Sequence, residues 1–298
     1  MTNKTCQELI SKELAESKRL KTKRELIFKG VTYTFLGLFG ITMILPFLWM
    51  ISTSLKEPQA VYAFPPRWIP DPVVWASYLK VWTVVPFARF YLNSILVALA
   101  VTVGQVLTSA FAAYSFSRLT FPGRDKLFFS YLATMMIPGS VTLVPVYILM
   151  VHFRWIDSYK ALIIPAMFSA YGTFMLRQFF MGIPRDLEDA ARIDGCSLFG
   201  IFWKIILPLS KPILATLVSF TFMASWNNFM WPLLVTESVE KKTLPIGLAY
   251  FQEVYQYTQP DWSLLMAGSL LVTIPVIVVF VFNQRFFVEG IKLSGIKG

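Results

Sequence analysis

Few residues in this 298-residue sequence could carry out chemistry. It contains one histidine, His152, and two cysteines, Cys6 and Cys196. A single histidine excludes an HExxH zinc site and leaves little room for a histidine-based triad. Two cysteines exclude a disulfide scaffold and a multi-cysteine metal site. No phosphate-binding G-x-x-x-x-G-K-[ST] loop is present. The sequence therefore predicts no catalytic residue and no metal site, and any ATP-driven activity has to draw its energy from another subunit.

The most informative polar residues lie between positions 183 and 196. Pro184 suits the first turn of a helix, and Glu188 and Asp189 then lie near the positive end of the helix dipole. Asp194 follows at helical spacing, and Gly195 suits the left-handed residue that ends a helix. This spacing predicts a short helix that ends in a glycine turn.

A second amphipathic stretch follows at 198–206, and Leu207-Pro208 ends it. Its apolar residues need a cover, so the two helices are expected to form one compact unit. We call residues 184–208 the knob. Ala190 and Ala191 lack bulk and are expected to let a partner approach it closely.

The elements on either side of the knob are predicted to be membrane helices, and the knob lies in the loop between the fourth and fifth of them. Hydrophobic residues make up 56% of the chain and charged residues 15%, against about 25% charged in soluble domains. A membrane-crossing helix needs about 20 mostly apolar residues. Six uncharged runs of this kind predict six spans: 31–51, 90–112, 127–150, 161–176, 212–236 and 263–284. Prolines within these runs predict bends, among them Pro46, Pro138, Pro145, Pro165 and Pro275.

Basic residues are unevenly distributed between the two sides of these spans. The side that holds both termini carries 19 of the 27 Lys and Arg residues, which predicts that both termini are cytoplasmic. The net charge of +10 then needs no nucleic acid as a partner. The basic N-terminal residues 1–26 form a tail, expected to be an amphipathic helix on the lipid surface, with disorder as the alternative.

None of the six runs contains Asp, Glu, Lys, Arg or His. Proton-coupled carriers need such groups within the membrane, whereas sodium can bind to backbone carbonyls. Uncharged polar residues are present, and each could serve either hydrogen bonding between helices or contact with a polar solute. The candidates for a substrate pathway are Asn93, Trp226, Asn227 and Asn228.

The knob sequence resembles a known motif. It resembles the coupling-loop ("EAA") motif of binding-protein-dependent ABC importer permeases. The matching residues are Asp189-Ala190-Ala191, then Gly195 after a gap of three residues, Ile205 after a gap of nine, and Leu207-Pro208 after a gap of one. Asp189 stands where that family usually has Glu. Two other segments resemble the carbohydrate-uptake branch of this family: Trp226-Asn227-Asn228-Phe229 and Asn93-Ser94. Within that branch, the sequence most resembles the six-span, maltose-permease-like subunit.

This resemblance implies an all-α membrane protein with the type I ABC importer permease (MetI-like) fold, in a bacterial or archaeal cytoplasmic membrane. It implies a permease domain at 27–288 and a cytoplasmic C-terminal tail at 289–298. The implied partners are a second, usually non-identical permease, two ATPase subunits that bind ATP and Mg, and an extracytoplasmic solute-binding protein. The implied substrate is a carbohydrate, such as an oligosaccharide. The implied ATPase-coupling residues are Glu188, Asp189, Ala190, Ala191, Asp194, Gly195, Ile205, Leu207 and Pro208.

Two alternatives remain open from the sequence. One is a sodium-driven secondary transporter that works without an ATPase. The other is an ABC permease for a glycerol-phosphate-type solute, because related permeases share the motif; a substrate phosphate would call for cationic groups, and none is visible in the spans.

Overall fold

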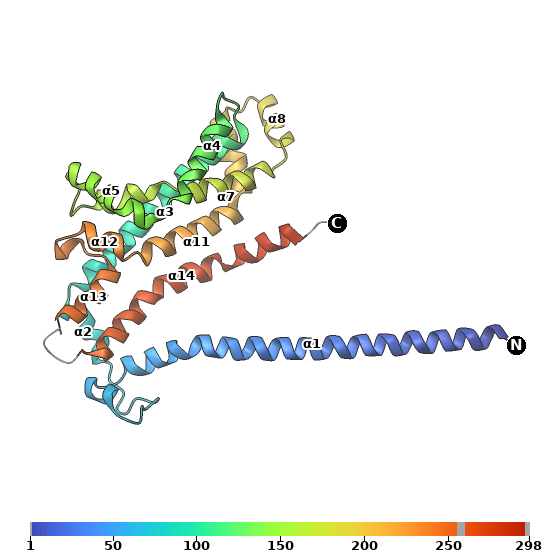
Figure 1. The fold of residues 1–298 in the computed structure, drawn as a ribbon, viewed down its shortest axis with the longest axis horizontal. Helices are drawn as coiled ribbons and strands as arrows, with labels where there is room; N and C mark the ends of the chain where they lie inside the picture. The colour runs from blue at the N-terminus through green and yellow to red at the C-terminus, as the bar shows by residue number, and fades with distance from the viewer. Residues whose placement is uncertain (1, 255–259, 296–298) are drawn as a thin grey trace. The chain divides into compact units, whose positions relative to one another are not determined.

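The computed structural model describes the backbone of residues 2–254 and 260–295 and the side chains of residues 24–251 and 260–284. The chain divides into two compact units, Met1–Val74 and Trp75–Gly298. In the described residues the regular structure is helical throughout (Figure 1).

The first unit is built on one long helix, α1 (Thr2–Ser54), followed by the short helix η1 (Pro58–Tyr62). The predicted span 31–51 lies within α1, and the helix continues through the expected end of the tail at residue 26. The side chains of residues 1–23, on which the amphipathic-tail prediction depends, lie outside the described residues. Residues Arg24–Ser54 are apolar enough to cross a membrane, and no residue of their apolar window is buried. Such a helix needs lipid or a partner as its cover.

The second unit contains the remaining helices. Its first part comprises α2 (Ala76–Val84), α3 (Phe87–Arg118), α4 (Arg124–Ala133), η2 (Thr134–Met136), α5 (Gly139–His152), α6 (Tyr159–Ile163), η3 (Pro165–Met167) and α7 (Ala170–Met181). Its second part comprises α8 (Asp186–Ile193), α9 (Leu198–Ile201), η4 (Phe202–Ile206), α10 (Leu207–Leu209), α11 (Lys211–Trp226), α12 (Met230–Val235), η5 (Val239–Lys241), α13 (Leu244–Val254) and α14 (Trp262–Gly295).

Helix α3 is the centre of the second unit. It packs against α7 and α11, and α11 packs in turn against α14 (Figure 1). Gly172 allows the close approach of α7, since a Cβ atom there would lie 2.7 Å from Ser109 Oγ on α3 and 3.2 Å from Leu217 Cδ1 on α11. Small residues of this kind are what lets membrane helices pack closely. Helix α8 and the α12–α13 region lie at opposite ends of these long helices.

The third predicted span, 127–150, is not one straight helix. Helices α4–η2 and α5 meet at 101° across a break at 137–138. Pro138 has no N–H to donate, and it drives Ile137 into an extended conformation (φ −87°, ψ 115°). The bend expected at Pro138 is confirmed, and it is a full break.

The fourth and fifth predicted spans are also divided. Residues 161–176 are divided among α6, η3 and α7, where Ser169 caps the new helix by accepting a hydrogen bond from Gly172 N at 3.0 Å. Residues 212–236 divide at Asn227 and Asn228 into α11 and α12. At 12 residues α7 is about 18 Å long, which is too short to cross a bilayer alone.

Within the described residues, three helices are long and apolar enough to cross a membrane: Arg24–Ser54, Phe87–Arg118 and Trp262–Gln284. Counting each of two bent pairs as a span raises this to five. Six apolar runs therefore exist, but only three of them are single membrane-length helices.

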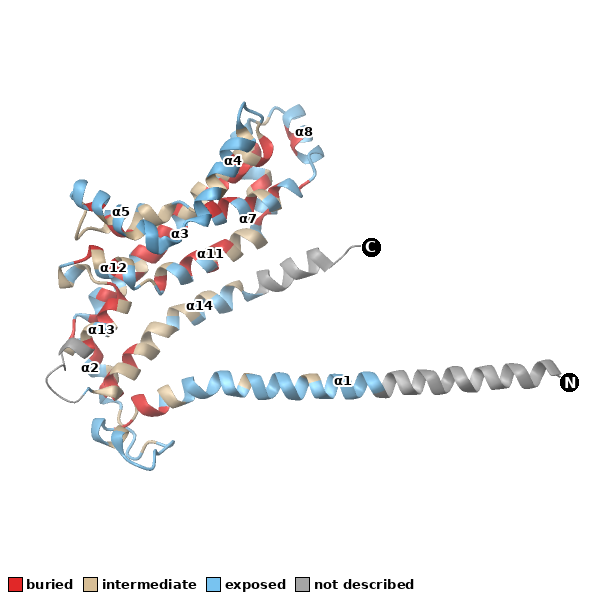
Figure 2. Ribbon diagram, viewed as in Figure 1, coloured by how far each residue is buried: buried red, intermediate tan, exposed pale blue. Residues whose placement is uncertain are grey.

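Buried residues in the second unit lie where helices face one another, and the opposite faces are exposed (Figure 2). One apolar cluster includes Phe87, Phe90 and Trp226, and another includes Tyr114, Phe180 and Phe202. The second cluster joins the knob to the ends of α3 and α7.

Candidate functional site

The knob has the predicted two-helix form. Helix α8 carries Asp186, Glu188 and Asp189 in its first turn, and Asp194 is its C-cap. Gly195 follows with φ +79°, the left-handed conformation that glycine adopts without strain. Cys196 N then donates to Ala191 O at 2.9 Å, which closes the end of the helix.

The second knob helix is continuous over α9, η4 and α10, and it bends by 80° into α11. Ser197 caps its start by accepting from Gly200 N at 3.2 Å. Residues 202–206 are wound as a π-helix, in which Leu207 N donates to Phe202 O. A π-turn shifts the hydrogen-bond register by one residue. It lies directly before Pro208, which has no N–H to donate to a carbonyl of the preceding turn. The helix therefore extends three residues beyond the predicted end.

A buried ion pair attaches α8 to α3. Arg118, the last residue of α3, places its Nε 2.9 Å from Glu188 Oε1, and both side chains are less than 5% exposed. Arg118 Nη2 also donates to the carbonyl oxygens of Phe180 and, at 2.7 Å, Ile183. Phe180 is in the last turn of α7 and Ile183 follows the helix, so both carbonyls lie at its C-terminal end. Arg118 thus joins the ends of α3 and α7 to the start of α8.

Apolar packing supports the same junction. Ala191 of α8 and Ile201, Phe202 and Ile206 of the second helix are buried against α3 and α7. Ile205 and Leu207 are half-buried at the edge of this cluster, and Pro208 is exposed.

The predicted coupling residues therefore divide into two groups. Glu188 and Ala191 face the chain's own core, so of the two alanines only Ala190 lies on the surface. Asp189, Ala190, Asp194 and Gly195 are exposed, and with them Leu187 (45% exposed) and Ile193 (87% exposed).

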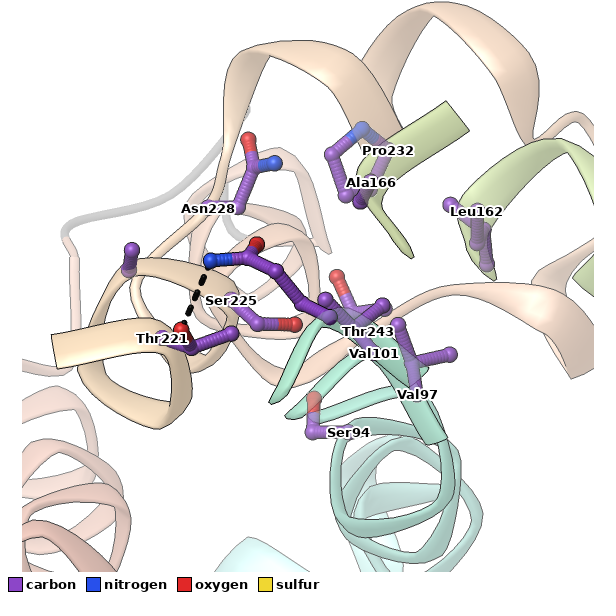
Figure 3. A pocket seen from close by; sticks show the side chains of 12 residues that line it. Ser94, Val97, Val101, Leu162, Ala166, Thr221, Ser225, Asn228, Pro232 and Thr243 are labelled. Atoms are coloured by element: carbon purple, nitrogen blue, oxygen red, sulfur yellow. Dashed lines mark hydrogen bonds between the residues drawn. The ribbon is translucent and has the colours of Figure 1, made fainter. Parts of the chain in front are cut away.

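A polar pocket lies between α3, α11 and α12, with a volume of about 130 Å³ (Figure 3). Helix α3 contributes Ser94 and Gln105 to it, and Gln105 Nε2 donates to Thr221 Oγ1 of α11 at 2.8 Å. The full lining is Ser94, Val97, Val101, Gln105, Leu162, Ala166, Thr221, Ala224, Ser225, Asn228, Pro232 and Thr243. No ionisable side chain is among these lining residues.

Of the four predicted pathway residues, the structure brings one into this pocket. Asn228 lines it, and its Oδ1 accepts from Trp231 N at 3.4 Å. Trp226 is buried in the apolar core and donates from Nε1 to Val272 O at 3.1 Å. Asn227 is exposed and caps the end of α11 by donating to Met223 O.

Asn93 is the fourth predicted residue, and it also lies outside the pocket lining. Its Nδ2 donates to Glu240 O at 2.8 Å and Lys242 O at 2.9 Å, and its Oδ1 accepts from Tyr159 Oη at 2.8 Å. A buried amide with its bonds satisfied inside the chain serves structure. The next residue, Ser94, lies in the pocket, and its Oγ accepts from Leu244 N at 2.7 Å.

Three further polar lining residues, Gln105, Thr221 and Ser225, were among the uncharged polar residues of the predicted spans but were not singled out, and Ser94 and Thr243 were missed. On α3 the lining positions 94, 97, 101 and 105 follow helical spacing, which was the available signal. Thr243 lies outside every predicted span and carried no such signal.

At the end of α3 far from the knob, Asp157 joins two loops. Its Oδ1 accepts from Glu237 N and Ser238 N, both at 3.1 Å, and from Ser238 Oγ at 2.8 Å. Burial alone would raise the pKa of Asp157, but these hydrogen bonds and nearby Lys241 hold that pKa below its ordinary value. Asn93 binds the same 237–243 segment, so we call this network of Asn93, Asp157 and Ser238 the far-end clasp.

Among the described residues, no group of three or more His, Cys, Asp or Glu side chains is arranged to hold a metal ion. The pocket can offer a solute uncharged polar contacts. The knob offers a partner an exposed helix that is anchored to α3.

Comparison with known proteins agrees with the sequence motif. Residues 105–292 match the family described as "Binding-protein-dependent transport system inner membrane component". The arabinooligosaccharides transport system permease protein AraQ of Bacillus subtilis is 38% identical over 212 residues, 71% of this chain and 74% of the relative. The sn-glycerol-3-phosphate transport system permease protein UgpE of Yersinia pestis is 36% identical over 262 residues, 85% of this chain and 92% of the relative.

The fold agrees as well. A crystal structure of a bacterial ABC transporter involved in the import of alginate matches with a TM-score of 0.78 at 24% identity, covering 88% of this chain and 96% of that chain. The match shows a shared fold. On the family match and these relatives, the chain belongs to the inner-membrane permease subunits of binding-protein-dependent ABC importers.

Proposed function

We propose that this chain is the non-catalytic half of a permease pair that imports a neutral carbohydrate, and that a separate ATPase drives it through the knob. The observation that carries the proposal is the knob itself: a helix anchored to α3 by a buried ion pair, with Ile193, Leu187 and Ala190 left exposed beyond it. An exposed helix fixed to the pathway-forming helices suits a part that receives force from a partner.

In this proposal Asp189, Ala190, Asp194 and Gly195 contact an ATPase subunit, which binds ATP and Mg. Ile205, Leu207 and Pro208 hold the second knob helix in place behind them. The knob and both termini lie in the cytoplasm, and the far-end clasp lies on the outer face of the cytoplasmic membrane, where a solute-binding protein delivers the substrate. A second permease, in most such systems non-identical, completes the pathway.

The pocket supports a neutral, hydroxyl-rich solute. Its polar lining consists of hydroxyl and amide groups, which bind sugar hydroxyls by hydrogen bonds. At about 130 Å³ it is smaller than a typical ligand site of 300 Å³ or more, as expected for half of a pathway that a partner completes. Asn228 contributes here, whereas Asn93, Asn227 and Trp226 support the fold around it.

The relative UgpE favours a second candidate solute, a glycerol phosphate. A phosphate would be held by cations such as Arg or Lys. No lysine or arginine lines the pocket, so a permease of this kind would have to hold the phosphate in its partner subunit.

Reconstitution into proteoliposomes tests the proposal. The chain is combined with its partner permease, ATPase and solute-binding protein, and uptake of radiolabelled neutral oligosaccharides and of glycerol 3-phosphate is measured with ATP inside. We expect oligosaccharide uptake that stops when ATP is replaced by a non-hydrolysable analogue. Uptake by the isolated chain that follows a sodium gradient would contradict the proposal and support a secondary transporter.

A further inference from the structure

The ion pair between Arg118 and Glu188 lies at the junction of α3, α7 and α8, and the proposed contact of the knob with an ATPase does not account for it. Both side chains are nearly inaccessible, so neither can bind a partner directly. In the described residues it is the one ion pair that connects α8 to another helix, since the others join Arg124 to Asp125 and Asp189 to Arg192.

Each charge lies where a helix end stabilises it. Arg118 ends α3 and binds two carbonyls at the C-terminal end of α7, so its positive charge meets the negative ends of two helices. Glu188 lies in the first turn of α8, at the positive end of that helix. The pair therefore fixes the direction of α8 relative to α3 and α7.

Helix α3 leads from this junction to the pocket. It carries Arg118 at its end and Ser94 and Gln105 in the pocket wall. One turn before Arg118, Tyr114 Oη donates to Leu198 O at 3.3 Å, which fastens the second knob helix to the same helix. A displacement of the knob is therefore passed to α3 as well as to α11, which continues directly from the knob.

We propose that Arg118 and Glu188 are positioning residues that make α8, α3 and α7 move as one body, so that the ATPase cycle reaches the pocket through α3. This inference rests on the proposed function. Without the pair, α8 would be held to α3 and α7 by apolar contacts and by the flanking loop segments, and it could swivel while the ATPase turned over.

The test compares uptake with ATP hydrolysis in the reconstituted complex. Glu188→Gln keeps the shape of the side chain and removes its charge. Arg118→Lys keeps the charge but has a single nitrogen, so it cannot contact Glu188 and the two carbonyls through separate nitrogens. We expect both variants to hydrolyse ATP at more than half of the wild-type rate, while solute molecules carried per ATP fall at least tenfold. Asp125→Asn, which removes an exposed ion pair with Arg124, is the matched control and should leave that ratio unchanged.

A double variant separates positioning from simple stability. Replacing a buried ion pair by apolar side chains of similar volume often preserves stability. Arg118→Met/Glu188→Leu should therefore assemble into the complex at wild-type yield but keep the low ratio of solute to ATP. Wild-type ratios in the double variant would overturn the proposal, as would a proportional fall of uptake and hydrolysis in Glu188→Gln. A wild-type complex that carries no solute would instead contradict the proposed function.

Discussion

Side chains of the same type serve different purposes in this protein. Asn93 and Asn228 are both amides in apolar segments, yet Asn93 is bonded to three partners within the far-end clasp and Asn228 lines the pocket. The sequence could not separate them, because the partners of Asn93 lie far along the chain: the carbonyls of Glu240 and Lys242 are 147 and 149 residues away, and Tyr159 is 66 residues away. Exposed Asn227 differs again, since it caps a helix.

We expect Asn93→Ala to destabilise the chain by about 2 kcal/mol or more, because buried partners are left without hydrogen bonds. Asn227→Ala, in an exposed position, should change stability by about 0.5 kcal/mol or less. Thermal unfolding in detergent measures both. Equal effects of the two substitutions would show that the clasp bonds contribute nothing.

Asp157 should give the far-end clasp a dependence on pH. Its folded-state pKa lies below the value of about 3.9 in an unfolded chain, so its hydrogen bonds stabilise fully above that value. The contribution is lost as the pH falls through the lower, folded-state pKa. Unfolding temperatures of wild type and Asp157→Asn, followed downward from pH 6, should draw together once the pH falls below about 3.9. Parallel curves would contradict this assignment.

At the scale of elements, hydropathy located the membrane segments but not their breaks. The six runs coincide with helices, yet the third breaks at Pro138 and the fourth at Ser169, where local backbone conformation and a capping hydroxyl decide. A hydropathy average cannot detect a change of direction. The knob was predicted well because its signals are local: acids in a first turn, then Gly195, then a proline.

The contact of α7 with α3 and α11 depends on Gly172. Gly172→Ala would place a methyl group 2.7 Å from Ser109 Oγ and 3.2 Å from Leu217 Cδ1, so we expect a loss of about 1 to 3 kcal/mol. Adding Ser109→Ala should recover part of it by removing the closest atom. Gly139→Ala is the control, because a Cβ atom there meets nothing within 4 Å. The unfolding temperatures of both variants are measured. A lower unfolding temperature for Gly139→Ala than for Gly172→Ala would refute the close-packing argument.

At the scale of the whole molecule, the distribution of basic residues predicts which side the knob occupies. Cys196 is a half-exposed free cysteine in the knob and reports on that side directly. In a Cys6→Ser background, a membrane-impermeant maleimide should label Cys196 in inside-out vesicles and not in right-side-out ones. Lys160→Cys, combined with Cys196→Ser, should show the opposite pattern from its exposed position in the first turn of α6. Labelling of both positions from the same side would reverse the assigned topology.

The knob surface is where the whole account is tested most directly. Ile193, the most exposed large apolar residue of α8, is replaced by Cys in a chain without Cys6 and Cys196. The assembled complex is treated during ATP turnover with a short cross-linker that carries a maleimide for this thiol and a succinimidyl ester for a lysine of the partner. Cross-linking should join this chain to the ATPase subunit, and Lys160→Cys should give no such product. A complex that transports its solute while Ile193→Cys never cross-links to the ATPase would contradict the account.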